Sequence, residues 1–196
     1  RQVGKTLLAK HRLKQEGCDT LYFNWDDIST RQAYFSDSRF FESPARSLGM
    51  KDPLIVFDEI HKRSHWRDIL KGVYDLFSNE FRFLITGSAR LDLFRRSGDS
   101  LVGRYNLFHM MPFNIRELIG KPEDTCFLKT IPPDEQMFEE FENLVSQPLQ
   151  PEIRDAYQTL LQYGPFPEPV LRQHDRFCRK WHQDYVTLLI RQDLRD

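Results

Sequence analysis

The sequence predicts an α/β fold built around a parallel sheet, and three observations lead to this prediction. Residues 53–57 form a continuous apolar run and residues 81–86 a mostly apolar one, and both are predicted to be buried strands. Between them, residues 66–77 carry apolar side chains at helical spacing. A helical segment at 5–15 also precedes a β-rich run at 20–25. Strands that alternate with helices in this way are typical of parallel sheets.

Each element follows from local signals along the chain. The first helix, residues 5–15, ends before Gly17, a residue that commonly stops helices. The first strand, residues 20–25, ends in two aspartates, and the run at 53–57 starts with a proline and ends in Asp58-Glu59. We expect a last strand at Tyr105–Met110. The helix at 66–77 has one apolar face, made of Trp66, Ile69, Leu70, Val73, Tyr74 and Phe77.

The composition changes after Gly120, where we place a domain boundary. Residues 1–119 form the α/β core in this interpretation, and residues 120–196 form a mostly helical lid and the start of a further domain. Residues 120–151 hold five prolines and many acidic side chains, with one helical stripe at 137–145. The rest is predicted to be helical, with an interruption at 164–169 that is rich in proline.

Composition disfavours several classes of protein. The 28 lysines and arginines nearly balance the 29 aspartates and glutamates, so nucleic acid is an unlikely partner. No apolar run reaches the length of about 18 residues that a membrane span needs. The three scattered cysteines argue against a disulfide framework or a zinc site, and the first residues lack signal-peptide character. We therefore expect a cytoplasmic protein without a membrane partner.

The strongest chemical signal is Gly4-Lys5-Thr6, which opens the first helix. It fits the end of the phosphate-binding pattern G-x-x-x-x-G-K-[ST], whose first glycine would lie two residues before Arg1. Backbone amides from Val3 to Leu7 would face phosphate oxygens, Lys5 would reach the β- and γ-phosphates, and the Thr6 hydroxyl would bind Mg²⁺. The alternative is a chance tripeptide at the start of a helix.

A second signal follows the buried run at 53–57. Asp58 stands at the end of the run, where it can hold Mg²⁺, and Glu59 can polarise an attacking water. The pair lies about 50 residues after Lys5, which leaves room for one helix–strand–helix excursion. The alternative is a strand that ends in a solvated acidic turn. Because the sequence lacks an Asn-Lys-x-Asp motif, ATP is favoured over GTP as the nucleotide.

Two further positions complete the predicted site. The run at 81–86 ends in small hydroxyl residues, so Ser88 or Thr86 could contact the γ-phosphate or the attacking water. Arg104 precedes the predicted last strand and could stabilise charge on the transferred phosphate, acting from a neighbouring subunit. The alternatives are a plain strand end for the hydroxyls, and for Arg104 a helix cap or a pair with Asp99.

These motifs resemble, in order, those of bacterial and archaeal AAA-superfamily ATPases that carry a C-terminal domain of unknown function. The resemblance implies a three-layer P-loop core with strand order 5-1-4-3-2, whose first strand lies outside this chain, followed by a helical lid. It also implies ATP hydrolysis with Mg²⁺. The matching segments are Arg1–Thr6, Asp26–Asp27, Phe57–Lys62, Ile85–Ser88, Leu101–Arg104, Met111–Leu118, Tyr163–Glu168 and Tyr185–Asp196.

Two functions from different classes fit these expectations. In the first, the protein hydrolyses ATP to ADP and phosphate to drive a conformational or remodelling step, and it acts as a homo-oligomer. In the second, it is a nucleotide-dependent binding switch with negligible turnover that recruits a protein partner. The intact Asp58-Glu59 pair favours turnover.

Overall fold

The computed structural model describes residues 2–87, 101–121, 148 and 150–192. The chain divides into two compact units, Arg1–Met110 and Met111–Asp196, which we treat separately. The boundary predicted near Gly120 falls within the second of these units and stays a prediction.

The described part of the first unit contains a parallel sheet of three strands. They are β1 (Tyr22–Asn24), β2 (Leu54–Asp58) and β3 (Arg82–Thr86), in the spatial order β1-β2-β3. In the register, Asn24, Asp58 and Thr86 are paired across the three strands. This confirms the predicted α/β class, and the order corresponds to the 2-3-4 part of the predicted sheet.

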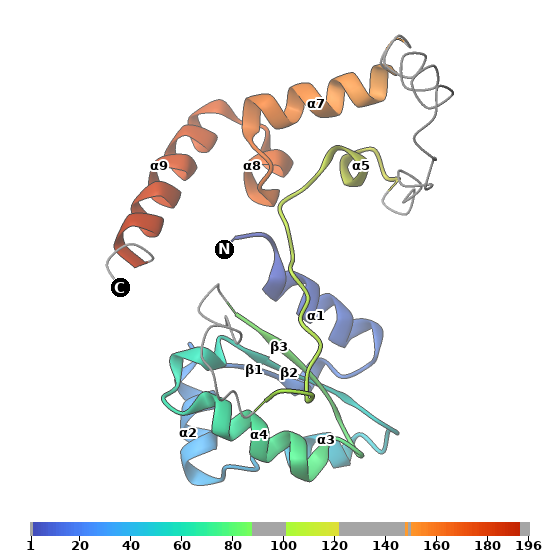
Figure 1. Ribbon diagram of the computed structural model, residues 1–196, viewed down its shortest axis with the longest axis vertical. Coiled ribbons are helices and arrows are strands. Elements are labelled where there is room, and N and C mark those ends of the chain that lie inside the picture. The colour runs from blue at the N-terminus through green and yellow to red at the C-terminus, as the bar shows by residue number, and fades with distance from the viewer. Residues whose placement is uncertain (1, 88–100, 122–147, 149, 193–196) are drawn as a thin grey trace, which may run out of the picture. The chain divides into compact units, whose positions relative to one another are not determined.

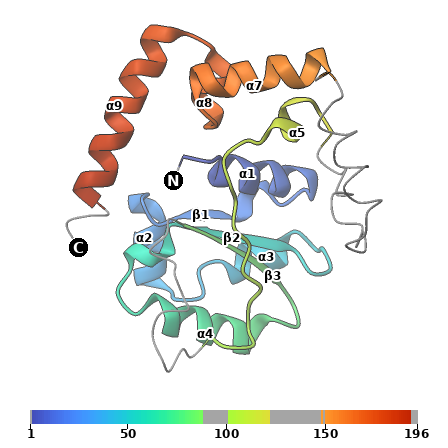
Figure 2. The same ribbon diagram turned by 45° about the horizontal axis from the view of Figure 1, so that its top comes forward.

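Helices cover both faces of this sheet (Figures 1 and 2). On one face lies α1 (Lys5–Gln15), and on the other lie α3 (Glu42–Ser47) and α4 (Trp66–Phe77). The other helical elements described in this unit are η1 (Asp19–Leu21), α2 (Ile28–Ser36) and η2 (Ile60–Lys62). The bounds of α1 and α4 are those that the sequence predicts.

The strand predicted at Tyr105–Met110 does not form. These residues adopt no regular secondary structure. None of the three described strands pairs with them in the sheet. Because a strand is defined by its pairing, the apolar pattern alone could not produce one.

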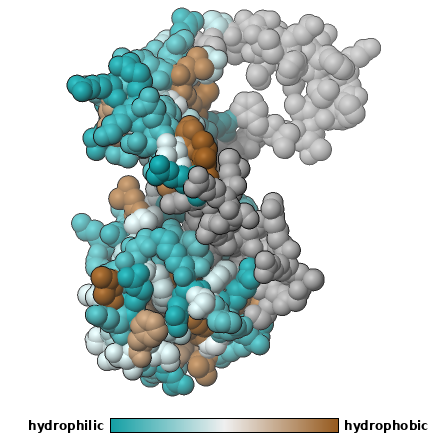
Figure 3. Space-filling view, turned by 90° about the vertical axis from the view of Figure 1, so that its left-hand side faces the viewer, coloured by the Kyte–Doolittle hydropathy of each residue, from teal (hydrophilic) through white to brown (hydrophobic). Residues whose placement is uncertain are grey.

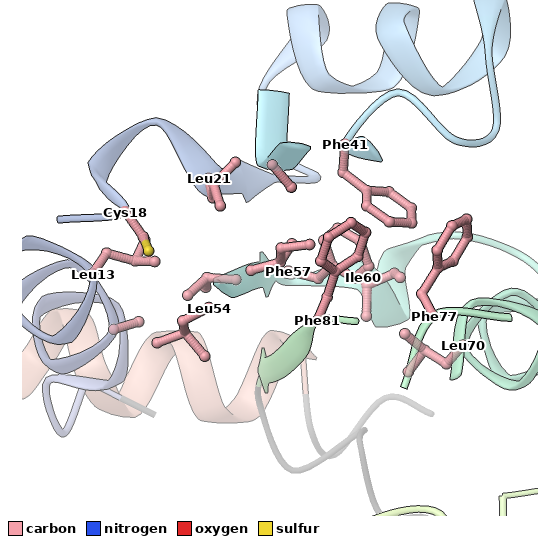
Figure 4. Close-up of a cluster of buried hydrophobic side chains, with 14 of the residues drawn as sticks. Leu13, Cys18, Leu21, Phe41, Leu54, Phe57, Ile60, Leu70, Phe77 and Phe81 are labelled. Carbon is pink, nitrogen blue, oxygen red and sulfur yellow. The ribbon is translucent and has the colours of Figure 1, made fainter. Parts of the chain in front are cut away.

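A cluster of aromatic rings fills the space between the sheet and the helices α3 and α4 (Figure 4). Phe41, which is 1% exposed, packs edge-on against Phe57 of β2 at 5.5 Å and against Phe77 of α4 at 5.3 Å between ring centroids. Phe83 of β3 joins the same cluster at 5.9 Å from Phe41. Edge-to-face packing at these separations is favourable beyond the area buried, so the rings bind strands and helices into one rigid layer.

The second unit is helical among its described residues. It contains α5 (Ile115–Leu118), α7 (Pro151–Tyr163), α8 (Pro167–Arg172) and α9 (Asp175–Gln192). Three rings pack together where α8 and α9 meet: Trp181 and Tyr185 are stacked at 5.0 Å, and Phe166 lies tilted against both. The helical stripe predicted at 137–145 lies outside the described residues.

The surface is mostly hydrophilic on the face drawn in Figure 3, where apolar side chains occur in small separate groups. Within the ranges that the structure describes, no helix combines the length and the apolar character needed to span a bilayer.

We expect Phe41→Ala to lower the free energy of unfolding by about 3–5 kcal/mol, because it removes the ring at the centre of the aromatic cluster and leaves a cavity. Chemical denaturation followed by circular dichroism measures this. Phe35→Ala is the control, since Phe35 is 68% exposed, and it should cost less than about 1 kcal/mol. Equal losses for the two variants would contradict the central place of Phe41.

Candidate functional site

The start of α1 presents free backbone amides. Gly4 precedes the helix with φ 94°, a left-handed conformation that favours glycine, and the first hydrogen bond of the helix runs from the Leu8 amide to the Gly4 carbonyl. The amides of Lys5, Thr6 and Leu7 therefore come before the intrahelical ladder. The first turn holds no acidic residue, so this positive helix end suits an anion.

The side chains around this turn differ in exposure. Val3 is buried and anchors the loop, while the Leu7 side chain is 71% exposed and can contribute only its backbone amide to the predicted site. Lys5 is half-buried and lies close enough to Asp58 to lower the pKa of that carboxyl. The predicted phosphate loop and the predicted metal carboxylate thus lie at the same end of the sheet.

Asp58 is the centre of the site. It is the last residue of β2, only 2% exposed, and its carboxylate accepts three hydroxyl hydrogen bonds. Thr6 of α1 donates to Oδ2 at 2.9 Å, Tyr22 of β1 donates to the same oxygen at 2.5 Å, and Thr86 of β3 donates to Oδ1 at 2.5 Å. Three elements of the unit therefore meet at one buried charge.

These contacts decide the ionisation of the pair Tyr22 and Asp58. Burial alone would raise the pKa of Asp58, but the hydrogen bonds from Thr86, Tyr22 and Thr6 outweigh it and lower the pKa below the usual aspartate value. The pKa of the Tyr22 hydroxyl is raised, first by burial and then by its bond to the Asp58 carboxylate. At neutral pH the carboxylate is therefore charged and the phenol is protonated.

Glu59 follows with a left-handed backbone, φ 59°, and its amide donates to the Thr86 carbonyl at 3.0 Å. Its carboxylate lies 3.4 Å from Nε2 of His61 and 3.6 Å from Nζ of Lys62. Lys62 also bonds both carboxylate oxygens of Asp26 in the loop after β1, at 2.5 and 2.7 Å. Glu59 is thus connected to that loop through one lysine.

The residues present fit a magnesium ion. Magnesium prefers hard oxygen ligands in octahedral geometry and keeps several waters, and its usual protein ligands include one or two carboxylates. The Thr6 hydroxyl and the Asp58 carboxylate supply hard oxygens 2.9 Å apart, beside the amides that would face phosphates. Because Asp58 is charged at neutral pH, its carboxylate can serve as a ligand without first losing a proton.

The two predicted sensor hydroxyls have different outcomes. Ser88 lies outside the described residues, so its position stays a prediction. Thr86, the alternative, bonds Asp58 through its hydroxyl and is 8% exposed. Its side chain is therefore part of the carboxylate network.

Arg104 lies elsewhere in the unit. Its Nε donates to Oδ1 of Asp75 at 2.7 Å, near the end of α4. Asp99, the partner that the sequence suggests, lies outside the described residues. Because α4 leads from the carboxyl end of β2 back to the amino end of β3, Asp75 belongs to the edge of the sheet opposite Asp58. Within one chain, the ion pair with Asp75 holds Arg104 away from the phosphate loop.

Sequence reasoning did not assign Tyr22 or Lys62 to the site. The available signal for Tyr22 was strand periodicity, because it stands two residues before Asn24, the register partner of Asp58, and so shares its face of the sheet. For Lys62 the signal was its spacing of three from Glu59 in a short helical turn. Neither spacing indicates on its own that the side chains would meet.

Comparison with known protein families gives a match. A family model described as an AAA domain matches residues 1–119, which is more than half of the chain and includes every residue of the site described above. No curated protein matches the chain.

Proposed function

The chain belongs to this AAA domain family, whose members are ATP-binding proteins in general, and we propose that it binds ATP with Mg²⁺ and hydrolyses it to ADP and phosphate. The observation that carries the proposal is the 2.9 Å hydrogen bond between the Thr6 hydroxyl and the Asp58 carboxylate. It joins the two motifs, separated by 52 positions, at one end of the sheet. We propose that the energy drives a conformational or remodelling step in the cytoplasm.

Each residue has a separate task in this mechanism. The amides from Val3 to Leu7 bind phosphate oxygens, and the Lys5 ammonium neutralises their charge. Thr6 and Asp58 hold the magnesium ion, which, when bound, stabilises negative charge on the phosphate oxygens.

Activation of the attacking water is the proposed task of Glu59, the acidic residue that follows β2. Glu59 orients this water and accepts its proton, which requires that the carboxylate leave its contacts with Lys62 and His61 or share them. We also propose that the Ser88 hydroxyl contacts the γ-phosphate.

The second candidate function is a binding switch with negligible turnover that recruits a protein partner. The specific observation in its favour is the ion pair between Glu59 and Lys62 at 3.6 Å, since a carboxylate that stays paired is a poorer base. Both candidates bind ATP, and they differ in the rate of hydrolysis.

We expect Lys5→Ala to weaken ATP binding by about 10- to 100-fold in the full-length protein, because it removes the charged donor of the phosphate loop. Isothermal titration calorimetry measures the affinity. Lys14→Ala is the matched control, since Lys14 is an exposed lysine in the last turn of the same helix. Wild-type affinity in Lys5→Ala would contradict the assignment of the phosphate loop.

Glu59→Gln should preserve ATP binding and slow single-turnover hydrolysis by about 10²–10⁴-fold, because an amide cannot accept the proton of the water. Glu80→Gln serves as the control, since Glu80 pairs with Arg46 on the surface. If the wild-type protein binds ATP but shows no measurable hydrolysis in the single-turnover assay, the switch is the better description. Normal turnover in Glu59→Gln would remove Glu59 from the mechanism.

We further propose that Arg104 acts on the nucleotide of a neighbouring subunit in a homo-oligomer. Arg104→Ala should then lower hydrolysis by about 10³–10⁵-fold, the range known for arginine fingers, and mixing it with Lys5→Ala protein should restore part of the activity. Asp75→Ala is the control, because it breaks the same ion pair and leaves the arginine in place. Equal rates in Arg104→Ala and Asp75→Ala would reduce Arg104 to a structural role.

A further inference from the structure

Two strands hold the Asp58 carboxylate from opposite sides. Tyr22 reaches it from β1 and Thr86 from β3, and both hydroxyls donate. Phosphate-loop motifs account for the contact with Thr6, but they do not account for the phenol. The phenol is therefore a feature of this chain that its motifs leave unexplained.

The position of Tyr22 follows from the sheet register. Tyr22 is paired with Val56, two residues before Asp58, so its side chain lies on the same face of the sheet as the carboxylate. The face is that of α1, because Thr6 of that helix also reaches Asp58. The ring is held from the helix as well, since Nζ of Lys10 lies 4.7 Å from its centroid.

The three hydroxyls donate hydrogen bonds to both oxygens of the Asp58 carboxylate. Oδ2 accepts from Thr6 and Tyr22, and Oδ1 accepts from Thr86. Because a carboxylate offers about four acceptor positions, these three donors leave one position for a further donor such as a water bound to a metal ion. Donors on both oxygens, from two different strands, also prevent the group from rotating.

We propose that Tyr22 is a positioning residue for the magnesium site, and that its hydroxyl orients Asp58 before the metal arrives. The inference rests on the proposed function, because it concerns the same site. A carboxylate whose orientation is fixed in advance loses little freedom when it binds a metal, so the phenol strengthens metal-dependent binding without contacting the nucleotide.

The test is Tyr22→Phe in the full-length protein, which removes the hydroxyl and keeps the ring under Lys10. ATP affinity is measured by calorimetry once with excess Mg²⁺ and once with EDTA. We expect binding with Mg²⁺ to weaken by about 10-fold, as for the loss of a hydrogen bond to a charged group, and binding without the metal to stay unchanged. Tyr34→Phe is the matched control, since the Tyr34 ring packs in the aromatic core against Trp25.

A second pair of variants tests the hydrogen bond that Thr86 donates to the other oxygen of Asp58. Thr86→Ser keeps a hydroxyl and should retain the metal dependence of wild type, whereas Thr86→Val should weaken it as Tyr22→Phe does. Thermal melting of all variants without ligand separates a loss of folding from a loss of positioning, so the inference stays testable if one variant unfolds.

The outcomes are distinct. Wild-type protein that does not bind ATP with Mg²⁺ would overturn the proposed function, and the inference with it. If the wild type binds and Tyr22→Phe binds equally well with Mg²⁺, only the inference is overturned. The inference is also overturned if Tyr22→Phe loses ATP affinity equally with and without Mg²⁺, since the phenol would then be structural. Tighter ATP binding by Tyr22→Phe in the presence of Mg²⁺ would overturn it too, since the phenol would then compete with the metal.

Discussion

The first unit is organised around one buried negative charge. Asp58 ends β2, the middle strand of the described sheet. It accepts hydroxyl hydrogen bonds from α1, β1 and β3, and the positive charge of Lys5 lies nearby. Burying a carboxylate without such partners would cost several kcal/mol, at about the scale of the whole stability of a domain. The position of Thr6, and with it the start of α1, is therefore tied to the position of β2.

The opposite face of the sheet supplies the rigidity that this arrangement needs. Phe57 comes directly before Asp58 and points away from it, into the rings of Phe41 and Phe83. Alternation along the strand thus places a polar centre on one side and an aromatic core on the other. Because a packed core permits little movement, the backbone at Asp58 is fixed by contacts that have no part in chemistry.

Much of this could be predicted from the sequence, for reasons that are local. The bounds of α1 and α4 follow from glycine signals and apolar spacing, β2 follows from a continuous apolar run, and β3 follows from a mostly apolar one. The first strand is shorter than expected because residues 19–21 form a tight helical turn. Residues 105–110 do not join the sheet of described strands, so they are not the strand that their pattern suggests. In the site, Gly4, Lys5 and Thr6 were identifiable because the spacing of a phosphate-binding loop is fixed by chemistry, and Asp58 was identifiable because it ends a buried apolar run. Tyr22 was not, because its hydroxyl meets Asp58 across 36 positions of sequence, and only when β1 lies beside β2.

Lys62 gives the site a dependence on ionic strength. Its ammonium is shared between Asp26 and Glu59, and the side chains of Lys62 and Asp26 are 47% and 52% exposed. Dissolved salt screens such contacts over a Debye length of about 8 Å at physiological concentration. The positions that the Glu59 carboxylate adopts therefore depend on the buffer as well as on the fold. Measurements at low and at high salt sample different populations of these positions.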